Sequence, residues 1–159
     1  MKAGRLLVTL AMAAVLGAWA KPMHSKTPIH VKIDIEPGSS AKIIVVSGSM
    51  SKNEMSDQMV PVAILSTKSF DATTVNVSTA ALGNDGMNAM ASSFGYGFPR
   101  ATIRDVNGDG IRDMVLQFPV AALMKDGALV HPTTRLCLTA KTSNGQSIRG
   151  CGSVRVPGQ

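Results

Sequence analysis

The sequence predicts an all-β protein, an antiparallel β-sandwich of about seven or more short strands with a calcium-type loop between two of them. Short runs of β-branched and apolar residues recur along the chain, separated by Gly, Pro, Asn and Asp. Residues 29–36 alternate strictly between apolar and polar side chains, which is the period of a half-buried strand. Alternation of long helices with strands is absent, so a parallel α/β fold is disfavoured.

Residues 1–20 have the features of a secretory signal peptide. Lys2 and Arg5 precede an apolar stretch over 6–18, and Ala18-Trp19-Ala20 has the small-x-small pattern of a cleavage site. A membrane anchor is the alternative, but the apolar stretch is shorter than the roughly 20 residues that a spanning helix needs. We therefore expect a secreted or periplasmic protein with no membrane span after cleavage.

The remainder is expected to form a disordered lead-in over residues 21–28 and a single β-sandwich domain over 29–159. The formal net charge is +6, and it falls to +4 when the two signal-peptide cations are removed. The basic residues are scattered rather than clustered, which argues against nucleic acid as a partner. We expect a monomer whose partner is an unknown protein or a cell-surface polymer.

The expected strands follow one another along this domain. The first is the alternating run 29–36, which the turn at 37–39 ends. The others cover residues 42–46, 59–65, 100–104, 114–118, 133–141 and 145–156. Short helices are expected only at 74–82 and 120–124.

Cys137 and Cys151 are expected to form a disulfide bond, because thiols of exported proteins usually pair. Asn144-Gly145 lies midway between them, and a three-residue loop over 143–145 would set the two cysteines opposite each other in a hairpin. The apolar residues of both strands then fall on the other face, so the bridge joins the polar face of the ribbon. A catalytic or metal-binding cysteine would call for a CxxC motif or a nearby histidine.

The segment 105–113 carries the clearest chemical signal. Oxygen-bearing side chains occupy its positions 1, 3, 5 and 9, namely Asp105, Asn107, Asp109 and Asp113, and the carbonyl of Ile111 stands at position 7. Gly110 at position 6 permits a sharp turn. These donors would supply most of the roughly six to eight oxygens that Ca²⁺ takes, so one bound calcium ion is predicted.

An acidic turn without a metal is the alternative interpretation of this loop, since Asn, Asp and Gly suit turns. Carboxylates crowded into nine residues repel one another unless a cation neutralises them, which favours the metal. Zinc would require His or Cys, and Mg²⁺ keeps more of its waters. Leu116 stands where an EF-hand places its bidentate Glu, so the expected setting is strand, loop, strand.

These motifs resemble a domain of exported bacterial proteins, often found at the C-terminal end of larger chains. The resemblance is carried by IxIxPGS at 33–39, VPVAIL at 60–65, FDATTV at 70–75, DVNGDGxxDMVLxF at 105–118 and CLTxxTxxGxxIxGCxSVR at 137–155. It implies a compact accessory β-domain with a calcium-type loop and supplies no catalytic residue. The chain departs from the pattern at 94–98, where a stretch rich in His and Gly is expected, and at Ile111, where relatives often carry an acidic residue.

The predicted function is therefore an exported calcium-binding structural or binding module without catalytic activity. One alternative is an adhesion or carbohydrate-binding module, which would use a binding loop containing Phe94, Tyr96 and Phe98 together with the cationic surface. The other is a small secreted hydrolase, whose site would need one of the three histidines beside a Ser or an acidic residue.

Overall fold

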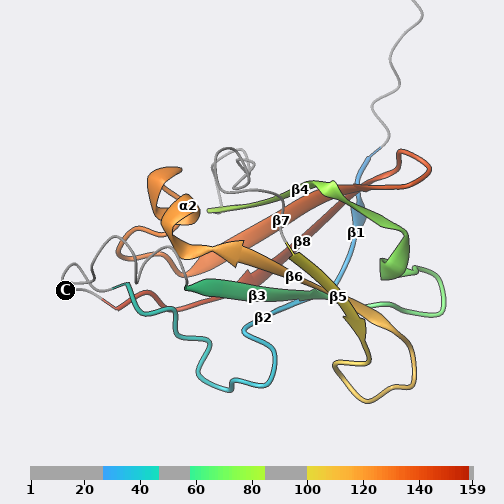
Figure 1. Ribbon diagram of the computed structural model, residues 1–159, viewed down its shortest axis with the longest axis horizontal. Helices are drawn as coiled ribbons and strands as arrows, with labels where there is room; N and C mark the ends of the chain where they lie inside the picture. Colours follow the sequence, from blue (N-terminus) through green and yellow to red (C-terminus); the bar gives the residue numbers. More distant parts are fainter. Residues whose placement is uncertain (1–26, 47–57, 85–99, 158–159) are drawn as a thin grey trace, which may run out of the picture.

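The structure is a computed structural model, and it describes residues 27–46, 58–84 and 100–157. The strands of these segments form two sheets that lie face to face (Figure 1). Their bounds are β1 Ile29–His30, β2 Ile33–Ile35, β3 Met59–Ile64, β4 Val75–Asn84, β5 Arg100–Arg104, β6 Asp113–Pro119, β7 Arg135–Thr142 and β8 Ser147–Ser153. A short 3-10 helix η1 covers Ala72–Thr74, and helix α2 covers Val120–Lys125. The predicted all-β sandwich is confirmed.

Each sheet has four strands. Sheet A has the order β1-β8-β7-β4, and sheet B has the order β2-β3-β6-β5. All strand pairs are antiparallel except β1 with β8, which is parallel. Strands β2 and β8, from different sheets, also contact each other, so the two layers meet along one side of the sandwich.

The single strand expected over residues 29–36 is wrong, because this segment crosses from one sheet to the other. The N–H of Val31 donates to the carbonyl of Arg149 in sheet A, and the carbonyl of the next residue, Lys32, accepts from Leu65 beside sheet B, both at 2.9 Å. Strict alternation survives such a crossing because a side chain that faces the interior in one sheet still faces it in the other. The pattern therefore could not reveal the break.

The helix expected over residues 74–82 is also wrong, since β4 covers most of them. The register of β4 against β7 shifts between Asn76 and Ala81, which marks a bulge. In this irregular stretch the hydroxyl of Thr79 accepts from the N–H of Lys141 at 2.8 Å. The β-branched residues and the need of β7 for a second neighbour outweigh the helical composition of the segment.

The other predicted elements fare better. Strands β3, β5, β6, β7 and β8 and helix α2 lie where the sequence predicts them, with boundaries that differ by a few residues. The strand expected over residues 42–46 is reduced to an isolated bridge between Ile43 and Arg155.

The core lies between the two sheets. Its largest fully buried side chains come from the inward faces of both, together with Leu123 of α2; they include Ile35, Val60, Val62, Ile64, Leu82, Leu116, Phe118, Leu136, Leu138 and Ile148. Burial of each such side chain is worth about 1.5–3 kcal/mol. The core thus holds the ends of the strands, where the loops attach, in fixed positions.

The predicted signal peptide and most of the predicted lead-in lie outside the described residues. Within the described segments, no helix has both the length and the apolar character needed to cross a bilayer.

Candidate metal centre and its surroundings

The predicted calcium loop joins β5 to β6 at one end of sheet B, in the strand-loop-strand setting that the sequence indicates (Figure 1). Gly108 and Gly110 have φ angles of +75° and +82°, a region that glycine adopts without strain. The carboxylate of Asp105 accepts from the N–H of Gly108 at 2.8 Å and from that of Gly110 at 2.9 Å. The loop therefore wraps around its first carboxylate.

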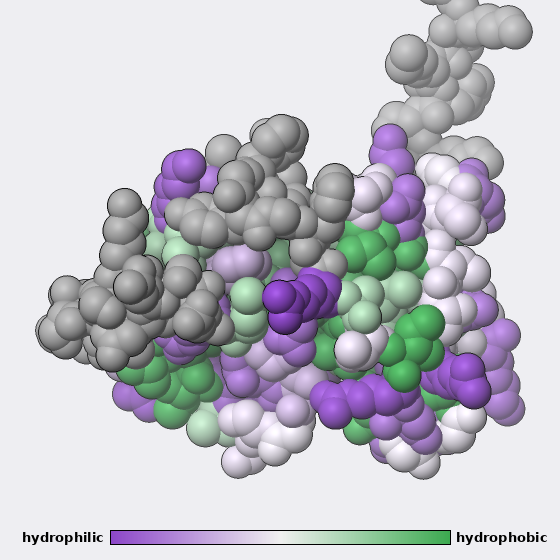
Figure 2. Space-filling model, viewed as in Figure 1, coloured by the Kyte–Doolittle hydropathy of each residue, from purple (hydrophilic) through white to green (hydrophobic). Residues whose placement is uncertain are grey.

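Asn107 and Asp109 fold back on the loop in the same way. The side-chain oxygen of Asn107 accepts from the N–H of Asp109 at 3.1 Å, and the Oδ1 of Asp109 accepts from the N–H of Ile111 at 2.8 Å. The amide of Asn107 also donates to the Oδ2 of Asp109 at 2.9 Å. Hydrophilic residues gather over this exposed part of the surface (Figure 2).

Asp113 differs from the other predicted ligands because it is fully buried. Its Oδ1 accepts from the N–H of Ser66 at 2.8 Å, and its Oδ2 accepts from the N–H of Val106 at 2.9 Å. This carboxylate thus fastens the start of β6 both to its own loop and to the segment that follows β3. Charge-assisted bonds of this kind are about twice as strong as neutral ones.

Ser66 completes the connection, and sequence reasoning missed it. Its hydroxyl donates to the carbonyl of Arg112 at 2.6 Å and accepts from the N–H of Ala72 at 2.9 Å. Ser66 lies 47 residues before Asp113, and no local pattern marks it as a partner of the loop.

The donor set of the loop fits a hard cation, because every candidate donor is a carboxylate, amide or carbonyl oxygen. In the described segments, no three His, Cys, Asp or Glu residues group closely enough to hold a metal by themselves. A cation in this loop would therefore rely on the amide oxygen of Asn107, the carbonyl of Ile111 and water as well as on carboxylates. That mixture suits Ca²⁺ and does not suit Zn²⁺.

The predicted disulfide between Cys137 and Cys151 is confirmed, in the predicted register. The N–H of Thr142 donates to the carbonyl of Gln146 at 2.9 Å, which leaves a three-residue loop over 143–145. Gly145, with φ of +81°, occupies the position where such a loop needs the left-handed conformation.

The bridge lies on the outer face of sheet A, as predicted. Leu136, Leu138 and Ile148 of the same ribbon belong to the core, so Cys137 and Cys151 alternate with them and lie on the opposite face of the sheet, where Cys137 is nonetheless buried. The guanidinium of Arg149 lies 3.7 Å from the sulfur of Cys137. The disulfide therefore fixes a polar face that carries cations.

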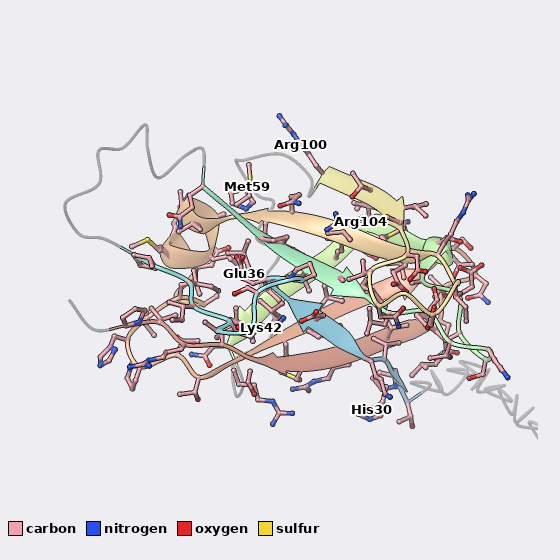
Figure 3. The ribbon with its side chains drawn as sticks, turned by 90° about the horizontal axis from the view of Figure 1, so that it is seen from below. His30, Glu36, Lys42, Met59, Arg100 and Arg104 are labelled. Atoms are coloured by element: carbon pink, nitrogen blue, oxygen red, sulfur yellow. A yellow bond between two sulfur atoms is a disulfide. The ribbon has the colours of Figure 1, made fainter. Side chains whose placement is uncertain are left out.

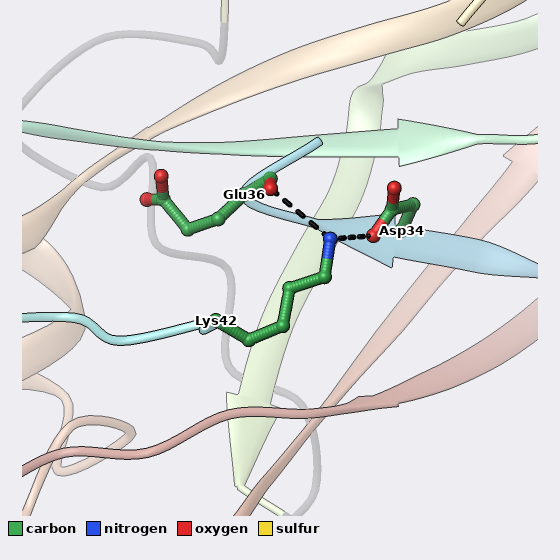
Figure 4. Close-up of polar contacts among 3 residues, drawn as sticks. All are labelled: Asp34, Glu36 and Lys42. Carbon is green, nitrogen blue, oxygen red and sulfur yellow. Dashed lines mark hydrogen bonds and ion pairs between the residues drawn. The ribbon is translucent and has the colours of Figure 1, made fainter. Parts of the chain in front are cut away.

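A second polar cluster surrounds the turn after β2 (Figure 4). The ammonium of Lys42 lies 2.5 Å from Oδ1 of Asp34 and donates to the backbone carbonyl of Glu36 at 3.1 Å. The carboxylate of Glu36 points away from that ammonium (Figure 4). Burial raises the pKa of Glu36 above its ordinary value, and the charge of Lys42 offsets part of this rise. No local sequence pattern indicated this cluster.

The residues behind the two alternative functions are only partly described. Phe94, Tyr96 and Phe98 of the predicted binding loop lie outside the described residues, as does His24. Nδ1 of His131 lies 3.2 Å from the backbone carbonyl oxygen of Val156. His30 is exposed and lies far from Arg100, on the side of β8 (Figure 3). Neither of these two described histidines hydrogen-bonds to a Ser, Asp or Glu side chain.

Comparison with protein-family models, with curated proteins and with solved structures found no match to the chain. The resemblance described above therefore stays a prediction.

Proposed function

We propose that the protein is an exported calcium-binding β-sandwich module with a structural or binding role and no catalytic activity. The observation that carries the proposal is the wrapping of the β5–β6 loop around oxygen-bearing side chains. Asp105, Asn107 and Asp109 all direct oxygens at backbone N–H groups of the loop itself. These bonds fix the backbone of the loop around its side-chain oxygens, and a cation would draw the carboxylates closer together than they now lie.

In this proposal Asp105, Asn107, Asp109 and Asp113 provide side-chain oxygens and Ile111 provides its carbonyl. Each oxygen of Asp113 already accepts one N–H, and a carboxylate oxygen has a second lone pair for further bonding. The ion would neutralise the carboxylates of the loop. Extracellular calcium modules bind with dissociation constants of roughly 10⁻⁴ to 10⁻³ M. Near 1 mM free calcium this corresponds to at most about 1.4 kcal/mol of added stability.

The proposed location is outside the cytoplasm, in a periplasm or beyond the cell. The predicted signal peptide and the Cys137–Cys151 disulfide both support this, because disulfides persist mainly in oxidising compartments. The proposed partner is a protein or a cell-surface polymer, bound by the monomer.

Calorimetric titration of the purified, oxidised protein with Ca²⁺ tests the metal site. We expect saturable heat for one ion, and a melting temperature that rises with Ca²⁺ and falls back with a chelator. Asp105→Ala combined with Asp109→Ala should abolish both responses. Asp126→Ala, which removes a carboxylate beyond the end of α2, should preserve them. Equal responses from all three proteins, or none from the wild type, would refute the proposal.

A further inference from the structure

The described strands of sheet A present cations, and no acidic residue, on the outer face of the sheet. Alternation along β7 and β8 places Arg135 and Lys141 on this face with Arg149, and the parallel register of β1 sets His30 beside Arg149. None of the four strands of sheet A contains an Asp or a Glu. In sheet B, by contrast, β2 carries Asp34 and β6 carries Asp113. The charges of the sandwich are therefore unevenly divided between its two sheets.

This face is also hollowed. A shallow depression of about 330 Å³ crosses it, and its lining includes Pro28, Thr79, Thr139, Lys141, Ser147 and Arg149. Lys141 pairs with Ser147, and Arg149 pairs with Thr139, so the two cations occupy diagonal positions on neighbouring strands. Diagonal neighbours lie roughly 7–8 Å apart, which lets both head groups reach a ligand in the same depression.

The two cations are held differently. The guanidinium of Arg149 contacts the sulfur of Cys137, which lies on the side of Thr139 away from Lys141. The backbone of Lys141 is fixed by the hydroxyl of Thr79, whereas its ammonium makes no ion pair or hydrogen bond with the described part of the chain. An anion in the depression would meet the flexible ammonium of Lys141, and the guanidinium of Arg149 would reach it by turning from Cys137 towards the depression.

We propose that this depression binds an anionic polysaccharide through its carboxylate or sulfate groups. Lys141 and Arg149 would pair with the anionic groups, and the hydroxyls of Thr79, Thr139 and Ser147 would bond to the sugar. A shallow groove across several strands accommodates a linear chain better than a compact ligand. The proposal rests on the role as a binding module but does not require the calcium loop.

Other polyanions fit this face less well. The described strands of sheet A contain no Phe, Tyr or Trp, so these strands offer nucleobases and neutral sugars no aromatic surface for stacking. Among the described residues of the sheet A strands, Ile29 is the large apolar side chain that is exposed, at 40 %, and its register with the buried Ile148 places it on the inner side at the edge of the sheet. One such side chain offers little apolar area for insertion into a bilayer. Affinity must come from charge and hydroxyl groups, as sulfated and carboxylated sugars allow.

The test measures binding of the purified protein, in the presence of a chelator, to immobilised polygalacturonate and dextran sulfate, with uncharged dextran as the blank. Lys141→Gln combined with Arg149→Gln should raise the dissociation constant by about tenfold or more. Lys68→Gln combined with Lys125→Gln removes the same charge from exposed positions elsewhere and should change it by less than about twofold. Ser147→Glu adds a carboxylate to the depression without removing a described contact, and it should weaken binding as well.

Equal losses from the two double variants would reduce the effect to net charge and overturn the proposal, as would absence of binding by the wild type. Tighter binding to phosphatidylglycerol vesicles or to duplex DNA than to either polysaccharide would overturn the choice of ligand. If thermal melting shows that the Lys141 and Arg149 double variant is unfolded, the Ser147→Glu variant replaces it in the test. Unchanged polysaccharide binding by Ser147→Glu would then overturn the proposal. If the protein does not bind the polysaccharides but the calcium titration gives the expected heat, only the anionic ligand is refuted. If it binds the polysaccharides but gives no heat with calcium, only the metal loop is refuted.

Discussion

The buried carboxylate of Asp113 accepts a hydrogen bond from the backbone N–H of Ser66 at 2.8 Å, across 47 residues of sequence. Its second oxygen accepts from Val106, so one side chain joins the β5–β6 loop to the segment between β3 and η1. The end of sheet B where the loop lies is thereby held as one unit.

Asp113→Asn should lower the free energy of unfolding by about 1–3 kcal/mol, because the amide places an NH₂ group against the N–H of the buried Ser66 or of the partly buried Val106. Urea denaturation in the presence of a chelator measures this loss without any contribution from a metal. The matched control is Asp126→Asn at a half-exposed position, which should cost much less. A loss no larger than that of the control would mean that the carboxylate does not fasten the loop.

Glu36→Gln should stabilise the protein at about pH 7 and have little effect at about pH 4. Burial raises the folded-state pKa of Glu36 above 4.5, so the folded protein holds this proton more tightly than the unfolded chain. The stability that the protonated Glu36 contributes is fully present below the pKa of the unfolded chain. It is lost as the pH rises through the pKa of Glu36 in the folded protein. Because Gln cannot ionise, the variant does not lose this stability as the pH rises. Denaturation midpoints measured across this range check the sign, and a variant less stable at neutral pH would contradict it.

Cys137→Ala combined with Cys151→Ala should lower stability by roughly 3 kcal/mol, the chain-entropy value for a loop of about this length. Reduction of the wild-type disulfide should produce a similar loss, which provides the internal control. Thermal melting of the oxidised, reduced and double-variant proteins gives the comparison. If the double variant loses more stability than the reduced wild-type protein, the additional loss would come from the contact between Arg149 and the sulfur of Cys137 rather than from the covalent bond.

Gly150→Ala should destabilise the protein by about 1–3 kcal/mol. A Cβ at this position would lie 2.6 Å from both the Val31 carbonyl oxygen and Cγ2 of Ile33, so the backbone must shift. Gly152→Ala is the matched control, because its Cβ would meet the movable end of Ile35 at 3.0 Å. Equal melting temperatures for the two variants would show that β8 does not pack closely on the crossing segment.

The hairpin of β7 and β8 was predictable because three local signals agree on one register. Asn144-Gly145 fixes the turn, the alternating apolar residues fix the faces, and two cysteines that must meet fix the pairing. The positions of β5 and β6 follow in the same way from turn-forming residues between two β-rich runs.

Features that depend on distant neighbours were not predictable. The crossing near Val31 keeps the alternating pattern, and β4 depends on β7 for its strand conformation. The acidic pattern marked Asp113 as a metal ligand, yet its position beside Ser66 is known only once β3 and β6 are paired. Sequence periodicity reports the environment of each residue and does not identify the partner that creates it.

The parallel pairing of β1 with β8 has a consequence for biosynthesis. It joins the beginning of the domain to its last strand, with Ile29 opposite Ile148. Strand β1 therefore has no hydrogen-bonded neighbour until β8 is present, and this edge of sheet A closes only after β8 has been made. Truncated products ending before Ser147 would lack the second cysteine and expose two strand edges at once, the state in which nascent β-proteins associate with one another.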